Sequence, residues 1–337
     1  KTLLINKVFN RYIKICNMKK ILGFWLLTII FISCIDDEHY SPVAPKEKDL
    51  VTPELSARMA SSSIAFTGLL EVYPCLQNTS TYYGNYRSGR QVVINGTYII
   101  SDGEVKPEMG LPVILPIGTY NILYWGKVQS SEPTYNNVAA SDAPLSIGSN
   151  LSQQYIGLWK PSLDTLYYPI YDYVYAVNPV EIGNERLSAS LQRKVAGVKI
   201  ILTNKDGKPF DDDIIKDVTV HIGGISEKMN FYTAEPVNPT KTVGINLSLS
   251  SDKMQYSNAT AMLLPSSDSP LLQIFITLKN GAVKIFKQNL SKAFIANEKL
   301  TLSLSLNEIF SEESSSGGFD VDQWDENHET IDLPPIN

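Results

Sequence analysis

Residues 300–306 read Leu-Thr-Leu-Ser-Leu-Ser-Leu, an uninterrupted alternation of apolar and hydroxyl-bearing side chains. Successive side chains of a β-strand point to opposite faces, so this row predicts a strand with one face in a core and the other in water. Upstream, residues 272–286 read LQIFITLKNGAVKIF, two apolar runs on either side of Asn280-Gly281. This second stretch predicts a β-hairpin, and the two stretches together predict an antiparallel sheet in the C-terminal half.

The register of this hairpin follows from its turn. Asn280-Gly281 accepts the positive φ angles of a two-residue loop, which would place Leu278 opposite Val283 and Ile276 opposite Ile285. A slip of one residue would turn every side chain over to the other face. The predicted core face of the hairpin consists of Ile274, Ile276, Leu278, Val283 and Ile285.

The composition extends the β prediction to the whole chain. The 337 residues include 18 Tyr, 20 Gly and 19 Pro, and 43% are apolar, which favours strands interrupted by turns around a sizeable core. Strand signals recur at short spacing in both halves, so we expect an all-β protein with two tandem antiparallel β-sandwich domains. The expected segments are an N-terminal sandwich at 64–184, a C-terminal sandwich at 185–310 and an acidic tail at 311–337.

The N-terminal stretch has the features of an export signal. Lys19 and Lys20 follow Met18 and precede an apolar run at 21–32. That run is shorter than the roughly 20 residues that cross a bilayer core, and it fits the apolar region of a signal peptide. We therefore expect residues 1–17 to be upstream translated sequence and residues 18–33 to be a lipoprotein signal peptide.

Cys34 is the expected lipidation site. The segment Phe31-Ile32-Ser33-Cys34 resembles a lipobox, in which the cysteine becomes the first mature residue and carries diacylglycerol. Fatty acids such as palmitate contribute about 0.8 kcal/mol for each buried CH₂, so two or three chains hold a protein that one chain would release. The alternative is an ordinary signal peptide with an incidental cysteine.

The residues after Cys34 suggest a surface-export signal followed by a tether. Asp36, Asp37 and Glu38 resemble the acidic cluster that marks Bacteroidetes lipoproteins for the outer face of the outer membrane. A solvated charge run is the alternative. Residues 34–63 contain several prolines and mixed charge, which predicts a tether.

The residue types required for catalysis are sparse. His39, His221 and His328 lack the spacing of metal ligands, and no hydrolase, metalloprotease or phosphate-loop motif occurs. Cys75 is predicted to be a small buried strand residue. The acidic run at 211–213 lacks the spacing of a calcium loop and predicts a solvated turn. We expect no enzyme activity, cofactor or metal, and the net charge of −6 argues against nucleic acid as a partner.

Two features are candidate surface sites. Tyr171, Tyr173 and Tyr175 share one face of a predicted strand, where they would stack sugars or contact a partner if exposed, and would form part of the sandwich if half-buried. A surface glycan-binding lipoprotein that uses this face is the alternative function. Thr165 lies in Asp164-Thr165-Leu166, which resembles the O-glycosylation motif of Bacteroides surface proteins.

Two longer segments resemble a known family. Residues 115–126, LPIGTYNILYWG, match a P-x-G-x-Y strand that ends in an aromatic-Gly pair. Residues 191–200, LQRKVAGVKI, match an R-x-x-A strand, with Gly197 in place of the usual basic residue. Both resemble the fimbrillin superfamily of Bacteroidales, and more narrowly its anchor or accessory subunits. Over residues 60–310 the resemblance implies two transthyretin-like β-sandwich domains without enzyme activity.

The resemblance also implies a function. It indicates a minor or anchoring subunit of fimbriae, located at the cell outer membrane through lipid on Cys34 and exposed at the surface. Strand-edge interactions with other fimbrial subunits would assemble it. Host protein and glycan are further candidate partners in cell adhesion. In similar subunits an arginine-specific cut before the first strand frees a groove, and Arg58 is the candidate position for such a cut.

Overall fold

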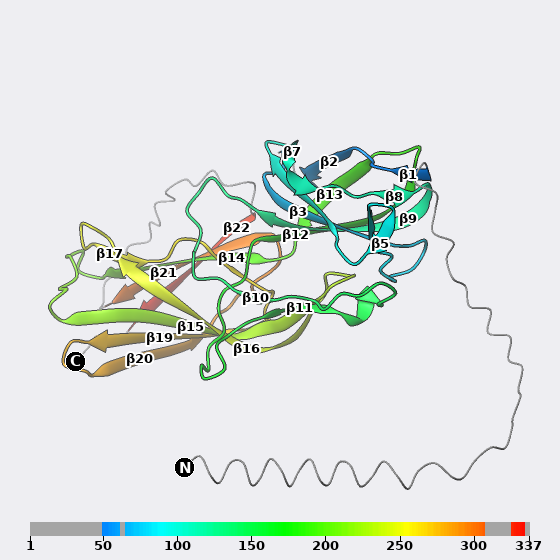
Figure 1. The fold of residues 1–337 in the computed structure, drawn as a ribbon. Coiled ribbons are helices and arrows are strands. Elements are labelled where there is room, and N and C mark those ends of the chain that lie inside the picture. The colour runs from blue at the N-terminus through cyan, green and yellow to red at the C-terminus, as the bar shows by residue number, and fades with distance from the viewer. Residues whose placement is uncertain (1–48, 61–64, 307–324, 334–337) are drawn as a thin grey trace, which may run out of the picture. The chain divides into compact units, whose positions relative to one another are not determined.

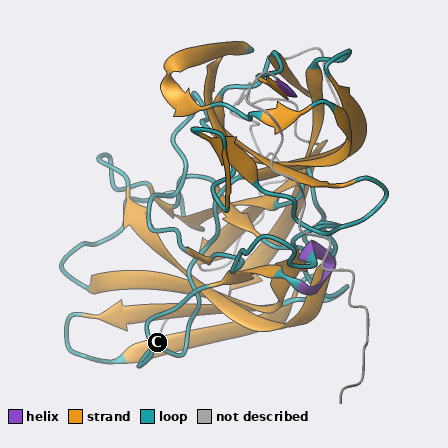
Figure 2. Cartoon of the chain, turned by 45° about the vertical axis from the view of Figure 1, so that its right-hand side comes forward, coloured by secondary structure: helices purple, strands orange, loops and turns teal. Residues whose placement is uncertain are grey.

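The computed structural model describes residues 49–60, 65–306 and 325–333, and it confirms the all-β prediction (Figure 1, Figure 2). The described residues belong to one compact unit and form two large sheets and two short strand pairs. The 3₁₀ helix η2 (Leu151–Gln153) interrupts the β-structure. The short pairs are β1 (Leu50–Val51) with β8 (Leu115–Pro116) and β4 (Asn85–Arg87) with β5 (Arg90–Val92).

The first sheet has seven strands. Their order is β2 (Leu55–Met59), β13 (Leu187–Arg193), β12 (Tyr173–Ile182), β9 (Gly118–Val128), β3 (Gly68–Leu76), β6 (Gly96–Ser101) and β7 (Glu104–Leu111). All neighbours are antiparallel except β2 and β13, which are parallel. This sheet contains the family-like segment 115–126, most of which is the central strand β9.

At the central strand β9 both faces of the first sheet are buried, and strand alternation divides them. On β9, Ile122 and Tyr124 point into a cluster formed by residues between Val51 and Leu191. Their neighbours Leu123 and Trp125 point into a second cluster, which includes residues of the second half. Each fully buried side chain of this size contributes about 1.5–3 kcal/mol, so this sheet is stabilised from two sides.

The second sheet is larger and folds over on itself. Along its main path the strands are β10 (Ala140–Ser141), β11 (Tyr155–Leu158), β15 (Ile215–Asn230), β16 (Pro236–Leu249), β17 (Gln255–Ser257), β14 (Ala196–Asn204), β21 (Glu298–Leu306) and β22 (Asp325–Leu333). Three further strands branch from it: β18 (Ala261–Leu263) on β14, β19 (Leu271–Leu278) on β15, and β20 (Val283–Asn289) on β19. The pairs β14–β21 and β21–β22 are parallel, a departure from the expected antiparallel pairing.

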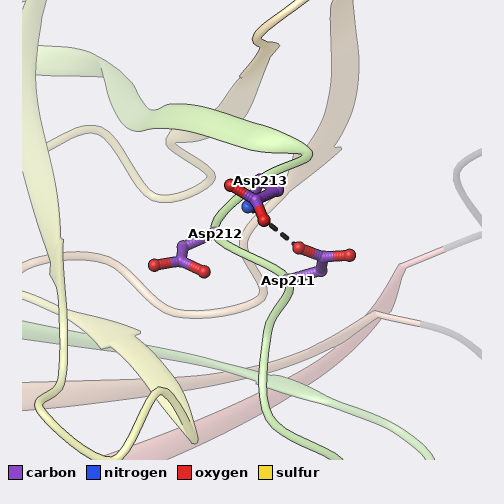
Figure 3. Close-up of side chains that lie close together, drawn as sticks. All are labelled: Asp211, Asp212 and Asp213. Carbon is purple, nitrogen blue, oxygen red and sulfur yellow. Dashed lines mark hydrogen bonds between the residues drawn. The ribbon is translucent and has the colours of Figure 1, made fainter.

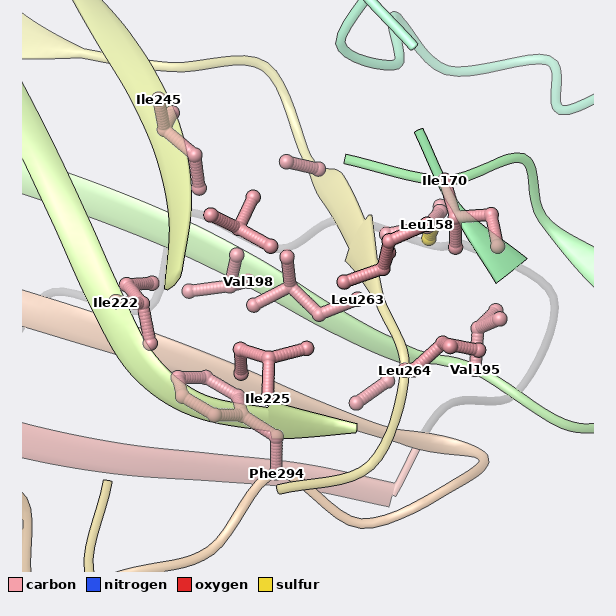
Figure 4. Packing of buried hydrophobic residues seen from close by; sticks show 14 of the residues in the cluster. Leu158, Ile170, Val195, Val198, Ile222, Ile225, Ile245, Leu263, Leu264 and Phe294 are labelled. Atoms are coloured by element: carbon pink, nitrogen blue, oxygen red, sulfur yellow. The ribbon is translucent and has the colours of Figure 1, made fainter. Parts of the chain in front are cut away.

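The core of the second sheet lies between its two layers. Figure 4 shows Val198 of β14, Ile222 and Ile225 of β15, and Leu263 of β18 converging from different strands. The predicted apolar row at 300–306 is confirmed, because all four of its leucines are buried while the intervening Thr and Ser are half-buried.

The hairpin register predicted from Asn280-Gly281 is wrong by one residue. The loop has three residues, and Thr277 rather than Leu278 lies opposite Val283. The amide of Lys279 donates to the carbonyl of Ile214 (2.9 Å), which draws that residue out of the hairpin ladder. Gly281 has φ +89°, as in a three-residue loop that ends in a left-handed residue.

The slip changes the core face of the hairpin. Ile274 and Ile276 are buried as predicted, but Val283 and Ile285 of β20 are each 49% exposed. Phe286 replaces them on the core side, where it packs partly against the second cluster.

The division between the two sheets does not follow the predicted segments. The strand β13 lies after residue 184 and still pairs with β12. The chain enters the second sheet at Ala196, only three residues after Arg193. Residues 134–170 belong to the predicted first sandwich, yet β10 and β11 pair within the second sheet. Strands β1 and β2 lie inside the predicted tether, and β22 lies inside the predicted tail, so both segments are shorter than expected.

Candidate functional site

The tyrosine row of β12 was the first candidate contact surface. Tyr173 and Tyr175 are 3% and 7% exposed, and Tyr171, which precedes the strand, is 37% exposed. The interpretation as an exposed aromatic face is therefore wrong for Tyr173 and Tyr175. Their face of the first sheet is covered by the second half of the chain, which the sequence of β12 does not reveal.

Trp125 is the centre of the aromatic joint, the name used here for Tyr73, Trp125, Tyr173, Tyr175 and Phe231. The Trp125 ring lies 5.1 Å from the Tyr175 ring, 5.8 Å from the Tyr173 ring and 5.9 Å from the Phe231 ring, measured between centroids. Tyr73 meets Phe231 edge-on at 5.0 Å. Because Phe231 directly follows β15, the aromatic joint connects the two sheets.

Hydrogen bonds to main-chain carbonyls satisfy two donors of the aromatic joint, those of Trp125 and Tyr175. The Trp125 Nε1–H donates to the Phe231 carbonyl at 2.8 Å, and the Tyr175 hydroxyl donates to the Tyr232 carbonyl. Burial raises the pKa of Tyr173 and of Tyr175, so both hydroxyls stay protonated at neutral pH. Satisfied donors and close ring packing are the properties of a structural connection rather than of a ligand surface.

A buried ion pair lies where the chain passes from the first sheet to the second. Arg193 donates from Nε to Asp172 Oδ1 at 2.7 Å and from Nη2 to Asp172 Oδ2 at 2.9 Å. The two side chains are 1% and 5% exposed. Arg193 is the arginine of the family-like R-x-x-A segment, but Asp172 was not identified as its partner from the sequence. The signal that could have indicated a buried, paired aspartate is its position between Tyr171 and Tyr173 at the start of a predicted strand.

The loop between β11 and β12 presents exposed aromatic and apolar side chains. Trp159, 43% exposed, lies against Tyr168 with a centroid distance of 5.7 Å and an interplanar angle of 32°. Leu163 is 95% exposed. Thr165 is exposed in the same loop and is therefore accessible to a modifying enzyme, while its glycosylation stays a prediction.

The acidic run at 211–213 forms an exposed turn (Figure 3). Within the described residues it is the one group whose Asp, Glu, His or Cys ligand atoms lie close enough to hold a metal ion. The amide of Asp213 donates to Asp211 Oδ1 at 2.9 Å. Lys253 lies 2.8 Å from Asp212 and Lys279 lies 3.5 Å from Asp213, so protein amines already balance two of the charges. The hydrogen bond from Lys253 lowers the pKa of Asp212.

The remaining reactive residue types do not form a catalytic group in the described part of the chain. Cys75 is fully buried in β3, as predicted, and burial raises the pKa of its thiol to about 12. His221 stacks on Phe275 with a centroid distance of 4.2 Å, and desolvation lowers its pKa. His39 lies outside the described residues, and for His328 the structure gives only its backbone pairing in β22.

Arg58 lies in a strand rather than in a leader, so its predicted placement is wrong. It is the fourth residue of β2 and pairs in parallel register with Ser190 of β13. Its side chain is exposed, while Ala57 and Met59 on either side are buried. The predicted cut at Arg58 would therefore release β2, the edge strand of the first sheet. The cut itself stays a prediction.

The lipidation and export residues lie outside the described residues. They are Cys34, Asp36, Asp37 and Glu38. In the part of the chain that the structure describes, no helix has the length and apolar character needed to cross a membrane.

Comparison with solved structures gives several distant matches. The fimbrial anchor protein Mfa2 from Porphyromonas gingivalis is 14% identical, with a TM-score of 0.41, over 71% of this chain and 80% of that one. A candidate adhesin from Bacteroides ovatus is 12% identical, with a TM-score of 0.44, over 79% and 88%. A candidate cell adhesion protein from Bacteroides uniformis is 18% identical, with a TM-score of 0.43, over 78% and 95%.

The comparison of sequences is more decisive. No curated protein matches the chain. One family profile does match, that of the fimbrillin-A associated anchor proteins Mfa1 and Mfa2, and it spans residues 67–330. The matched region contains the aromatic joint, the Arg193–Asp172 pair and most strands of both sheets. Because the profile covers well over half of the sequence, the chain belongs to the family of fimbrillin-A associated anchor proteins Mfa1 and Mfa2.

Proposed function

We propose that this protein is a surface lipoprotein that anchors fimbriae to the outer membrane through lipid on Cys34 and contacts other fimbrillins through strand edges. The family match over residues 67–330 carries the proposal. Membership of an anchor family supports association with fimbrial subunits at the cell surface. The lipobox-like segment that ends at Cys34 supplies the means of attachment.

The described fold suits an anchor in two respects. The aromatic joint connects the two sheets through the contact between Trp125 and Phe231, so a load applied to one sheet passes to the other. Edge strands such as β2 and β20 offer main-chain donors and acceptors to a partner strand.

The test replaces each of two cysteines in cells that produce fimbriae. Cys34→Ala is expected to abolish labelling by a fatty-acid probe and to release fimbriae into the medium. Cys75→Ala is the matched control, because Cys75 is buried in β3 and should keep both lipid labelling and retained fimbriae. Equal labelling of the parent protein and the Cys34→Ala variant would contradict lipid anchoring.

Surface display is tested separately. Replacing Asp36, Asp37 and Glu38 together by Ala should leave the protein lipidated but protect it from protease added to intact cells. Replacing the acidic run at 211–213 by Ala removes the same charge from a folded turn and should leave protease access unchanged. If both variants are digested as the parent is, the cluster after Cys34 does not direct surface export.

A further inference from the structure

A polar cleft lies between the segment that follows β9 and the strands of the second sheet. Its volume is about 350 Å³, at the lower end of the range of small-ligand sites. One wall is formed by Glu132 and Pro133, between β9 and β10. The other wall is formed by Lys199 of β14 and by residues 248–250 and 257–260, which include the ends of β16 and β17.

Both walls of the cleft are fixed by hydrogen bonds to the main chain. The amide of Tyr135 donates to the carbonyl of Thr260 at 2.9 Å, which holds the first wall against the second. The buried Asn258 accepts the Ile200 amide at Oδ1 (2.7 Å) and donates from Nδ2 to the Val198 carbonyl (3.1 Å). Asn258 thereby holds the second wall on β14. The cleft is preformed, as small-ligand sites usually are.

The cleft presents hydroxyl groups that are not used within the chain. Ser248 of β16 lies directly opposite Ser257 of β17, and Thr260 follows two residues after Asn258. The hydroxyls of these three lining residues make no hydrogen bond to another described residue. Thr260 is only 8% exposed, so its unpaired hydroxyl is reached from the cleft rather than from the open surface. The Glu132 carboxylate likewise has no ion pair or hydrogen bond among the described residues.

A smaller chamber adjoins the cleft. Its volume is about 10 Å³, which is room for one water molecule or one ligand hydroxyl. The chamber shares Glu132, Pro133 and Thr260 with the cleft, and the buried Asp172 also lines it. A hydroxyl that entered the chamber would therefore meet the Thr260 hydroxyl close to the buried Arg193–Asp172 pair, in a part of the molecule that this pair fixes.

The lining favours a neutral ligand that is rich in hydroxyls. Glu132 is the one acidic residue and Lys199 the one basic residue of the larger cleft, which favours neither an anion nor a metal ion. Lys199 already has an interaction within the chain and is given no role in binding. The apolar lining is limited to Pro133, Leu249 and Ala259, enough for the C–H face of one ring. Serine and threonine hydroxyls donate and accept, and a carboxylate accepts, so together they match the adjacent hydroxyls of a sugar.

We propose that this cleft binds an uncharged sugar residue of a glycan. The Glu132 carboxylate would accept hydrogen bonds from adjacent sugar hydroxyls, while Ser248, Ser257 and Thr260 would bond to others. The inference goes beyond anchoring, because it adds recognition of a carbohydrate to attachment at the cell surface. The cleft is also distinct from the tyrosine row of β12, where Tyr173 and Tyr175 are buried.

Saturation-transfer NMR on the purified protein tests the cleft with three probes, methyl α-mannoside, methyl β-galactoside and N-acetylglucosamine. At least one probe should receive saturation from the parent protein. Ser257→Tyr places a ring in the cleft and should abolish that signal. Ser248→Ala combined with Ser257→Ala should weaken binding roughly tenfold, and Glu132→Gln should do the same, because each change removes hydrogen bonds to the sugar.

Matched controls remove the same groups outside the cleft. Ser188→Ala combined with Ser190→Ala removes two exposed hydroxyls from β13, and Glu104→Gln removes an exposed carboxylate from β7. Both should bind the probe as the parent does, and circular dichroism checks that every variant is folded. The proposal is overturned if none of the three probes receives saturation. It is equally overturned if Glu132→Gln and the Ser248, Ser257 double variant bind as tightly as the parent.

Two competitors identify the source of the glycan. Displacement of the bound probe by glycans released from host mucin would indicate adhesion to the host. Displacement by polysaccharide extracted from the producing bacteria would indicate contact with the cell's own surface. If neither competitor displaces the probe, the cleft takes free sugar only and a glycan ligand is ruled out. Glu132→Gln should leave fimbriae attached to the cells, so failure of the sugar site and failure of the anchoring role are distinguishable.

Discussion

The strands β12 and β20 have similar sequence patterns and opposite surroundings. In both, large apolar or aromatic side chains occupy alternate positions. Tyr173 and Tyr175 of β12 are buried because the second half of the chain, including Phe231, covers their face. Val283 and Ile285 of β20 are half exposed because β20 is an outermost strand. Alternation identifies the side chains that share a face, whereas segments distant in the sequence decide whether that face is covered.

The largest effect is expected where the chain passes between the sheets. Arg193→Ala should lower the free energy of unfolding by about 3–5 kcal/mol, because the Asp172 carboxylate would remain buried without its partner. Arg186→Ala removes an exposed pair with Glu54 and should leave stability nearly unchanged. Urea unfolding measures both. Similar losses in the two variants would mean that the Arg193–Asp172 pair is accessible to solvent.

A direct comparison of the two strands comes next. Tyr173→Ala should cost about 3 kcal/mol, because it empties part of the aromatic joint. Ile285→Ala should change the stability of the monomer by less than about 0.5 kcal/mol, because the Ile285 side chain is half exposed to water in the folded chain and makes few packing contacts. Thermal unfolding monitored by circular dichroism gives both values. A large loss for Ile285→Ala would show that the outer face of β20 is covered.

Alkaline pH should reveal the burial of Cys75. Burial raises the pKa of its thiol from 9.0 to about 12, so its contribution to stability is complete below pH 9 and is lost as the pH rises towards 12. Between pH 9 and 10 the parent should lose about 1 kcal/mol more than Cys75→Ala, since only the unfolded thiol ionises there. Parallel pH profiles for the two proteins would contradict this account.

The smallest change in stability is expected for Tyr124→Phe, which is compared with Tyr98→Phe in the same sheet. Tyr124 is fully buried, and its hydroxyl has no hydrogen-bond partner among the described residues, whereas the Tyr98 hydroxyl accepts the Val113 amide at 2.8 Å. Tyr124→Phe should leave stability unchanged or raise it by up to about 1 kcal/mol, and Tyr98→Phe should cost about 1–2 kcal/mol. Equal losses in urea unfolding would indicate a bound water at Tyr124.

Local pattern was sufficient for much of the fold. The alternation at 300–306 and the burial of Ile274 and Ile276 follow from side-chain periodicity alone. The hairpin register did not follow, because a hydrogen bond from Lys279 to Ile214, far away in the sequence, competes with the preferred two-residue turn. Turn preference is a local property, and tertiary contacts override it.

The site residues show the same limit. The family-like segment pointed to Arg193, but its partner Asp172 lies 21 residues earlier, directly before β12, and only the fold brings the two together. The tyrosine row of β12 was correctly placed on one face, yet its burial depends on Phe231. Residues 134–170 were assigned to the N-terminal sandwich, because nothing local reveals that their bridge partners Val243, Thr260 and Met262 lie in the second half.

The position of β2 has a consequence for the order of folding. Leu55 pairs with Leu187, about 130 residues later, so the edge of the first sheet cannot close until β13 is available. The aromatic joint cannot form until Phe231 has been synthesised, and β14 cannot pair with β21 until residue 306 has been synthesised. Because the chain is synthesised from its N-terminus, neither sheet can be completed early. Such non-local topology is expected to fold slowly, which keeps the chain unfolded for longer after synthesis.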